Sequence, residues 1–207
     1  MLDEQRYEQY LTALLRGDRQ QCMDIVLALR ETDIKAEKLY TELFQRSLYQ
    51  VGDLWEQNRI SVAVEHLATA ITENLISIIY PEILKNRVPL NRKAVISCSI
   101  NEYHQVGARM VADIMESYGW DCWFLGANTP IEDLLTLIQD KNPDLLGLSV
   151  SIYFNMLPLK NMIDQIRAHY PQLDIFVGGQ AFRWGSVDFF KSIQKLAYIP
   201  SLQDLTQ

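Results

Sequence analysis

The sequence predicts an N-terminal four-helix bundle followed by an α/β domain with a doubly wound parallel sheet, of the flavodoxin or Rossmann-like kind. Two patterns predict this fold class. Apolar residues recur at helical spacing through residues 1–85, whereas residues 94–207 alternate short apolar strands with amphipathic helices. Strands that alternate with helices favour a parallel sheet, because each crossover helix has to cover a face of the sheet.

The helical half contains four apolar stripes, each of helical period. Turn-forming pairs are expected to end the first three, and Ser61 is a good N-cap residue for the fourth, which runs towards Pro81. The stripes are Leu11–Leu15, Cys22–Leu29, Leu39–Val51 and Leu67–Ile79, and the pairs are Gly17-Asp18, Thr32-Asp33 and Gly52-Asp53. Short turns between such helices predict an antiparallel bundle.

The change of pattern predicts the domain organisation. Residues 1–85 form the bundle, the polar, proline-containing segment 86–93 is a linker, and residues 94–207 form the α/β domain. The expected strands are 94–99, 120–125, 145–150 and 174–177, and the expected helices are 106–118, 131–141, 157–169 and 187–196. In such sheets ligands sit at the carboxyl ends of the strands.

The composition argues against two classes of function, nucleic-acid binding and membrane association. The net charge is −7 and no run of Lys or Arg makes a phosphate-binding stripe, so we expect no direct nucleic-acid binding. We expect no membrane association, because we find no apolar stretch that could span a bilayer and no signal-peptide core. Three widely spaced cysteines without a Cys-x-x-Cys pair indicate buried thiols in a reducing, cytoplasmic setting.

The segment Glu102-Tyr-His104-Gln-Val-Gly107 follows the first expected strand and opens the next helix. A neutral imidazole can ligate a metal through one nitrogen while its other nitrogen donates a proton to an acceptor. Glu102, two residues earlier in the same loop, can supply that acceptor. Gly107 stands where the helix would approach the sheet or a ligand closely. The loop therefore indicates a metal-ligating histidine.

This loop resembles that of the cobalamin-binding family of methionine synthase and the coenzyme-B12 mutases, which reads Asp-x-His-x-x-Gly. Further matches cover the chain from about Ala94 to Val187: Gly119-Trp120, Leu125–Pro130, Leu148-Ser149 and Gly178-Gly179. The resemblance implies that cobalamin is the cofactor. It also implies that His104 is the lower axial ligand of cobalt, in place of the dimethylbenzimidazole base.

By the same resemblance, five small residues line the slot for the displaced nucleotide tail: Gly126, Ser149, Ser151, Gly178 and Gly179. A larger side chain at these strand ends would fill the slot. The chain departs from the family pattern in two places. Glu102 replaces the usual Asp, and the third strand ends Ser149-Val-Ser151 where the family usually has Ser-x-Leu.

The helical half carries a second motif, Trp55-x9-Glu65-His66, with Trp55 before a turn and the Glu-His pair early in the fourth helix. It is similar to the signature of the light-sensing, adenosylcobalamin-binding regulators. The resemblance implies that these three residues cap the upper face of the corrin. Adenosylcobalamin is then the favoured cofactor form, with methylcobalamin as the alternative, and His66 is a possible upper cobalt ligand.

Three functions agree with these motifs. The first is a stand-alone cobalamin sensor, responsive to light, that signals through a protein partner or a homo-oligomer. The second is a corrinoid carrier that shuttles methyl groups between methyltransferases, and the third is a small subunit of a B12 mutase. In none of them is the chain an enzyme by itself, because the chemistry belongs to cobalt. The cap motif alone favours the sensor over the carrier.

Overall fold

The computed structural model describes residues 2–32, 34–85, 87–185, 190 and 192–206. The chain divides into two compact units, Met1–Ile83 and Leu84–Gln207. The first strand of the second unit begins at Lys93, one residue before the expected start. The linker 86–93 stays a prediction, and its first residue, Asn86, lies outside the described residues.

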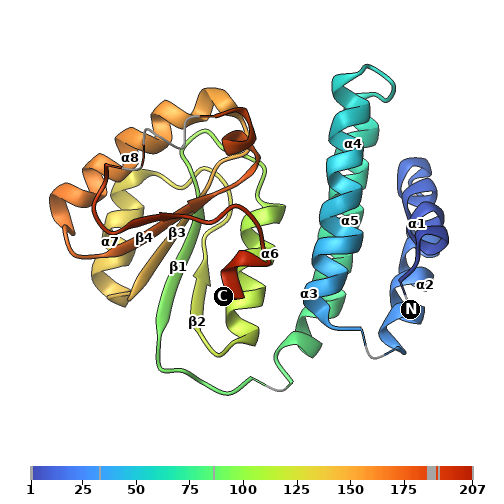
Figure 1. The fold of residues 1–207 in the computed structure, drawn as a ribbon, viewed down its shortest axis with the longest axis horizontal. Helices are drawn as coiled ribbons and strands as arrows, with labels where there is room; N and C mark the ends of the chain where they lie inside the picture. Colours follow the sequence, from blue (N-terminus) through green and yellow to red (C-terminus); the bar gives the residue numbers. More distant parts are fainter. Residues whose placement is uncertain (1, 33, 86, 186–189, 191, 207) are drawn as a thin grey trace. The chain divides into compact units, whose positions relative to one another are not determined.

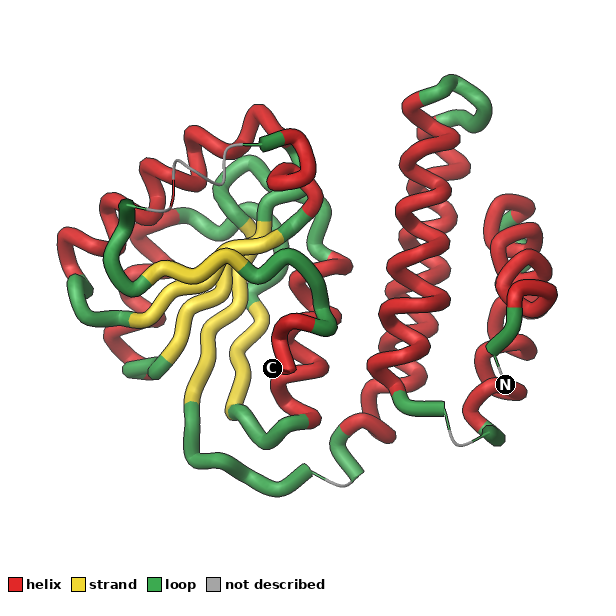
Figure 2. Tube along the Cα trace, viewed as in Figure 1, coloured by secondary structure: helices red, strands yellow, loops and turns green. Residues whose placement is uncertain are grey.

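The first unit is the expected helical bundle. Figure 2 shows its helices, among which three consecutive elements follow one another as one continuous helical stretch. The elements are α1 (Glu4–Arg16), α2 (Arg19–Arg30), α3 (Ala36–Lys38), the π-helix η1 (Leu39–Gln45), α4 (Arg46–Glu56) and α5 (Val62–Ile83). With α3, η1 and α4 taken together, the described part of this unit has the four helical stretches that the sequence predicts.

Side chains cap the starts of α1, α2 and α5. The side chains of Asp3 and Asp18 accept hydrogen bonds from the backbone N–H groups of Arg6 and Gln21, which start α1 and α2. The predicted cap at Ser61 is confirmed, because its hydroxyl accepts from the backbone N–H of Val64 at 3.4 Å.

The predicted break at Gly52-Asp53 is wrong, because both residues lie inside α4. The buried Val51 and Leu54 on either side of this pair pack in the bundle and carry the helix through it. Helix propensity is a weak term that tertiary packing overrides. Of the predicted break at Thr32-Asp33, Asp33 lies outside the described residues, and α2 ends at Arg30.

Helix α5 corrects the expectation that the chain has no apolar stretch that could span a bilayer. It is long and apolar enough to pass a length-and-composition test for a membrane span. One such helix is weak support for a span, since the core helix of a soluble protein passes the same test. Ile71, Leu75 and Ile76 of α5 are buried in the bundle, which accounts for its apolar character.

The second unit is a five-stranded parallel sheet in the order β2-β1-β3-β4-β5, the flavodoxin-like arrangement. Figure 1 shows helices on both of its faces. The strands are β1 (Lys93–Cys98), β2 (Asp121–Phe124), β3 (Leu145–Ser149), β4 (Asp174–Gly178) and β5 (Leu196–Tyr198), and the helices are α6 (Val106–Ser117), α7 (Ile131–Lys141) and α8 (Met156–His169). Short 3-10 turns follow β3, at η2 (Tyr153–Asn155), and β4, at η3 (Gln180–Trp184), and η4 (Asp204–Thr206) lies near the C-terminus.

Each face of the sheet buries its own core. Helix α6 packs on Ala94, Ile96 and Cys98 of β1, while α7 and α8 pack on the opposite face around Val95 and Leu146. This alternation along β1 is the period-two pattern of a strand buried on both faces. The fold class predicted from the sequence, a helical bundle followed by a doubly wound parallel sheet, is confirmed.

The C-terminal part of the sheet differs from the prediction. The fifth strand, β5, was not predicted, and its first residue, Leu196, is the last residue of the helix expected over 187–196. It pairs with β4 through Leu196 and Tyr198. Residues 192–195 form turns and a bend, so the helix expected over 187–196 is wrong there. Residues 186–189 and 191 lie outside the described residues, and the expectation stays a prediction for those of its residues.

Candidate functional site

The histidine loop lies at the topological switch point of the sheet. Strand order reverses between β1 and β3, which lie side by side, and the loop that follows β1 carries Glu102 and His104. The loop that follows β3 carries Ser151 and Asn155. In open α/β sheets this crevice at the carboxyl ends of the strands is the usual place for a ligand.

The His104 ring is fixed by Glu102. Its Nδ1 lies 2.6 Å from Glu102 Oε1, and the backbone N–H of His104 donates to the same oxygen at 3.0 Å. Because the carboxylate is ionised and can only accept, Nδ1 carries the proton, and the Nε2 lone pair is the one suited to a metal. The His104 side chain is 56% exposed, whereas that of Glu102 is fully buried.

Hydrogen bonds from two loops hold Glu102 in its ionised form. Its second oxygen, Oε2, accepts from the backbone N–H groups of Ser151 at 2.8 Å and Ile152 at 2.9 Å. Burial by itself raises the pKa of Glu102. The His104 ring and the backbone N–H groups of Ile152, His104 and Ser151 more than offset that effect, and they lower the pKa to about 2.

Asn155 is a site residue that the sequence reasoning missed. Its side-chain amide donates to Glu102 Oε2 at 3.3 Å and to the carbonyl of Asn101 at 3.1 Å. Asn128, after β2, adds two further hydrogen bonds to the histidine loop. Its backbone N–H donates to the Glu102 carbonyl, and its side-chain oxygen accepts from the Asn101 N–H. The available signal was a polar residue in the loop after β3, at the same edge of the sheet as His104.

The fold requires glycine at some of the predicted glycine positions and not at others. Gly179 has φ +115°, and a Cβ there would lie 2.1 Å from the carbonyl oxygen of Val150, so the protein itself demands glycine at this position. At Gly178 an added Cβ would come 3.0 Å from the Ile199 carbonyl. An added Cβ at Gly107 would meet nothing within 4 Å, so the sheet does not require that glycine and the space beside it is open.

The other predicted slot residues also lie at the carboxyl ends of the strands. Ser149 ends β3 and accepts from the backbone N–H of Ser99, and Gly126 follows β2 with its backbone carbonyl bonded to Cys98. Ser151 contacts Glu102 through its backbone. Ser99 is fully buried, and its hydroxyl has no hydrogen-bond partner among the described residues. Such an orphaned donor suits a polar ligand group at this edge.

The cap motif lies at one end of the helical unit. Trp55 is the last residue but one of α4, and Glu65 and His66 lie in the first turns of α5. The indole is 45% exposed, so it is not a core residue. His66 Nε2 lies 3.5 Å from Glu65 Oε2, and the hydroxyl of Thr69 donates to Glu65 Oε1 at 3.0 Å. The His66 side chain is 75% exposed.

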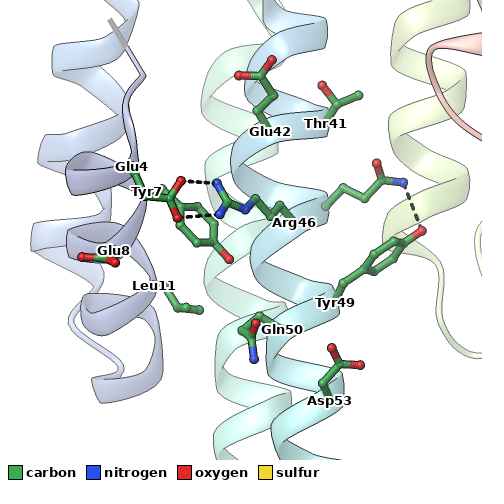
Figure 3. A pocket seen from close by; sticks show the side chains of 11 residues that line it. Glu4, Tyr7, Glu8, Leu11, Thr41, Glu42, Arg46, Tyr49, Gln50 and Asp53 are labelled. Carbon is green, nitrogen blue, oxygen red and sulfur yellow. Dashed lines mark hydrogen bonds and ion pairs between the residues drawn. The ribbon is translucent and has the colours of Figure 1, made fainter.

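A groove elsewhere in the helical unit is separate from this motif. It has a volume of about 600 Å³ and lies between α1 and the continuous stretch of η1 and α4. In Figure 3 the Arg46 guanidinium points at the Glu4 carboxylate, in a bidentate ion pair at 2.6 and 2.9 Å, and it also stacks on the Tyr7 ring. None of the residues predicted for the site lines this groove.

The donor set of the second unit fits a corrin cobalt. Within the described parts of the chain, no three His, Cys, Asp or Glu side chains come together to hold a metal ion. A corrin already supplies four nitrogens, so the protein needs to offer a single axial ligand. An exposed imidazole with a buried carboxylate behind it is suited to that role.

Two family models match the chain. Residues 92–192 match one described as "B12 binding domain", and residues 6–80 match a second model of the same description. The first match contains the histidine loop at the switch point, and the second covers the helical bundle. The chain is therefore a cobalamin-binding protein in which a helical cap domain precedes a Rossmann-like B12-binding domain.

Similar proteins fall into two groups. The HTH-type transcriptional repressor CarH of Myxococcus xanthus is 28% identical over 148 residues, which cover 70% of this chain and 48% of CarH. CarA of the same organism is 29% identical over 91 residues, 44% of this chain and 31% of CarA. The chain thus spans about half the length, or less, of these relatives.

The second group consists of corrinoid proteins. Dimethylamine corrinoid protein 3 of Methanosarcina acetivorans is 19% identical over 155 residues, 71% of this chain and 70% of that protein. The structure of the Methanosarcina barkeri monomethylamine corrinoid protein superposes with a TM-score of 0.84 at 17% identity, over 99% of this chain and 96% of that one. The likeness to the monomethylamine corrinoid protein establishes the fold of both domains.

Proposed function

We propose that this protein is an adenosylcobalamin-dependent sensor that signals through a protein partner and responds to light. One observation carries the proposal: Trp55 and His66 are exposed and Glu65 is partly exposed, and all three lie at the end of the cap domain where α4 ends and α5 begins. The indole, 45% exposed, is accessible to a ligand or a partner. The likeness to CarH and CarA supports a regulatory function.

The lower face of the cofactor is assigned to the histidine loop. In this proposal His104 ligates cobalt through Nε2 while Glu102 holds its Nδ1 proton, and Gly126, Ser149, Ser151, Gly178 and Gly179 border the nucleotide tail. Gly107 leaves room beside the ligand. The buried carboxylate fixes both the tautomer and the direction of the ring before cofactor arrives.

The upper face is assigned to the cap. Adenosylcobalamin supplies a light-sensitive cobalt–carbon bond when it is bound. The Trp55 indole excludes water from that bond, and Glu65 accepts hydrogen bonds from the ribose hydroxyls. His66 lies beside the same carboxylate, where it can approach the upper ligand or replace it.

A corrinoid methyl carrier is the second candidate. The two-domain layout agrees over nearly the full length with a monomethylamine corrinoid protein, and a dimethylamine corrinoid protein is among the relatives. In that case methylcobalamin would be the cofactor form, and the partner would be a methyltransferase.

The cap assignment is tested by the Trp55→Ala variant. We expect its affinity for adenosylcobalamin to fall about fivefold, as for the loss of one aromatic contact, while methylcobalamin and hydroxocobalamin bind as before. Titration followed by absorbance gives the three dissociation constants. Trp184→Ala is the matched control, since Trp184 is a still more exposed indole in the other domain. An equal change in all three affinities of Trp55→Ala would exclude the cap.

The sensor and carrier functions are separated by light. Protein loaded with adenosylcobalamin in the dark is examined by absorption spectroscopy and by size-exclusion chromatography, before and after green light. A base-off, His-on spectrum that converts on illumination, with a shift in elution volume, supports the sensor. Tight binding without any light-driven change in size or partner affinity favours the carrier.

A further inference from the structure

Helical Glu-x-x-x-Thr and Glu-x-x-x-Ser pairs recur in this chain, and the hydroxyls of four of them make two different kinds of hydrogen bond. The hydroxyls of Thr41, Ser77 and Thr136 each donate to the backbone carbonyl of the glutamate four residues earlier, at 2.9 to 3.0 Å. This is the usual local bond of a Ser or Thr inside a helix. The Thr69 hydroxyl instead donates to the side-chain carboxylate of Glu65, at 3.0 Å.

The exception falls on the carboxylate of the cap motif. The Thr69 bond takes Oε1 of Glu65, and the second oxygen, Oε2, faces the His66 ring at 3.5 Å. The Glu65 side chain is 22% exposed, so it is accessible to a ligand but restricted by its neighbours. A glutamate otherwise rotates freely about its last side-chain bonds, and one firm donor removes much of that freedom.

We propose that Thr69 is a positioning residue that sets the specificity of the cap for the upper ligand. It holds Glu65 with Oε1 occupied, so that Oε2, beside the His66 ring, is the oxygen left to accept from a ligand hydroxyl. The inference rests on the proposed adenosylcobalamin function, and it goes beyond that function by adding a residue outside the Trp-x9-Glu-His motif. Thr69 itself contacts no cofactor in this account.

The test is the selectivity of the holoprotein, measured as the ratio of the dissociation constants for methylcobalamin and adenosylcobalamin. Thr69→Val keeps the shape of the side chain and removes the hydroxyl. We expect it to lower this ratio about fivefold, the size of one typical hydrogen bond, because Thr69 acts only through Glu65, and the change should come from adenosylcobalamin alone. Thr69→Ser keeps the hydroxyl and should restore the wild-type ratio.

Two further variants make the result decisive. Thr41→Val is the matched control, because it removes the same hydroxyl from the same kind of pair in the same domain, where the acceptor is the Glu37 carbonyl. Its ratio should equal that of the wild type. Glu65→Gln tests the proposed function: if it lowers the ratio and Thr69→Val does not, the positioning role is refuted and the cap stands. If Glu65→Gln leaves the ratio unchanged, the cap function fails and the role of Thr69 fails with it.

Discussion

Glu102 and Glu65 each lie beside a histidine, but the two domains hold these pairs in different ways. Glu102 is fully buried, and it accepts hydrogen bonds from the His104 ring, three backbone N–H groups and the Asn155 amide. Glu65 is partly exposed, lies 3.5 Å from the His66 ring, and accepts one hydrogen bond from Thr69. Five hydrogen bonds hold the Glu102 carboxylate, whereas one holds the Glu65 carboxylate.

Under the proposed function, this difference suits the two faces of a cobalamin. A permanent axial ligand gains from a ring whose tautomer and direction are fixed in advance, and many donors achieve this. A cap that has to admit, cover and release an exchangeable group needs weaker constraints, because a fully bonded carboxylate could not accept from a new ligand. We therefore expect substitutions in the buried pair to have larger effects than substitutions in the exposed pair.

The largest effect is expected for His104→Ala. It removes the only residue proposed as the lower ligand, so the base-off, His-on absorption signature should disappear and cobalamin affinity should fall by more than about 100-fold. His169→Ala is the control, because His169 ends α8 with its Nδ1 beside the Gln165 carbonyl. A retained His-on spectrum in His104→Ala would show that cobalt takes another ligand.

Glu102→Gln should have the next largest effect. The amide keeps the size of the carboxylate, but it no longer provides two accepting oxygens for the His104 ring and the N–H groups of Ser151 and Ile152. We expect cobalamin affinity to fall about tenfold, in the range of such supporting residues. Titration of all cobalamin forms measures it, with Glu132→Gln at the exposed start of α7 as the control. A loss confined to adenosylcobalamin would contradict the assignment to the lower face.

Asn155→Ala should have the smallest effect of the three. Its bond to Glu102 is the longest, at 3.3 Å, and other donors to that oxygen remain. One lost neutral donor of about 1 kcal/mol predicts an affinity lower by about fivefold. The exposed Asn161 of α8 supplies a control variant, Asn161→Ala. An effect as large as that of Glu102→Gln would mean that the backbone donors alone do not hold the carboxylate.

Much of this molecule could be predicted from its residues, because local patterns determine it. The alternation of strands and helices predicts the sheet, and the short spacing from Glu102 to His104 predicts the contact between their side chains. Both depend on neighbours in sequence. The cap residues Trp55 and Glu65 are likewise placed at one end of the bundle by a short turn.

The features that could not be predicted depend on distant contacts. Asn155 reaches Glu102 across 53 positions of sequence, and no spacing signals that bond. Strand β5 has three residues, too few to show a period, and it forms because β4 offers an edge. Gly52 stays helical because its neighbours are buried, which a propensity scale does not register.

The π-helix η1, from Leu39 to Gln45, has a consequence for how the cap evolves. A π segment accommodates one residue more than the same length of α-helix, and such segments recur at functional sites. Loss of that one residue would convert the π turn to α-helix over the same length, so α4 would keep its direction and its phase. Trp55 would then stay at the same side of the bundle. A single deletion inside α4 itself would instead turn Trp55 by about 100° about the helix axis, since 3.6 residues make a turn. Relatives that differ by one residue between residues 39 and 45 should therefore keep the indole in place, whereas relatives that differ by one residue between 46 and 54 should not.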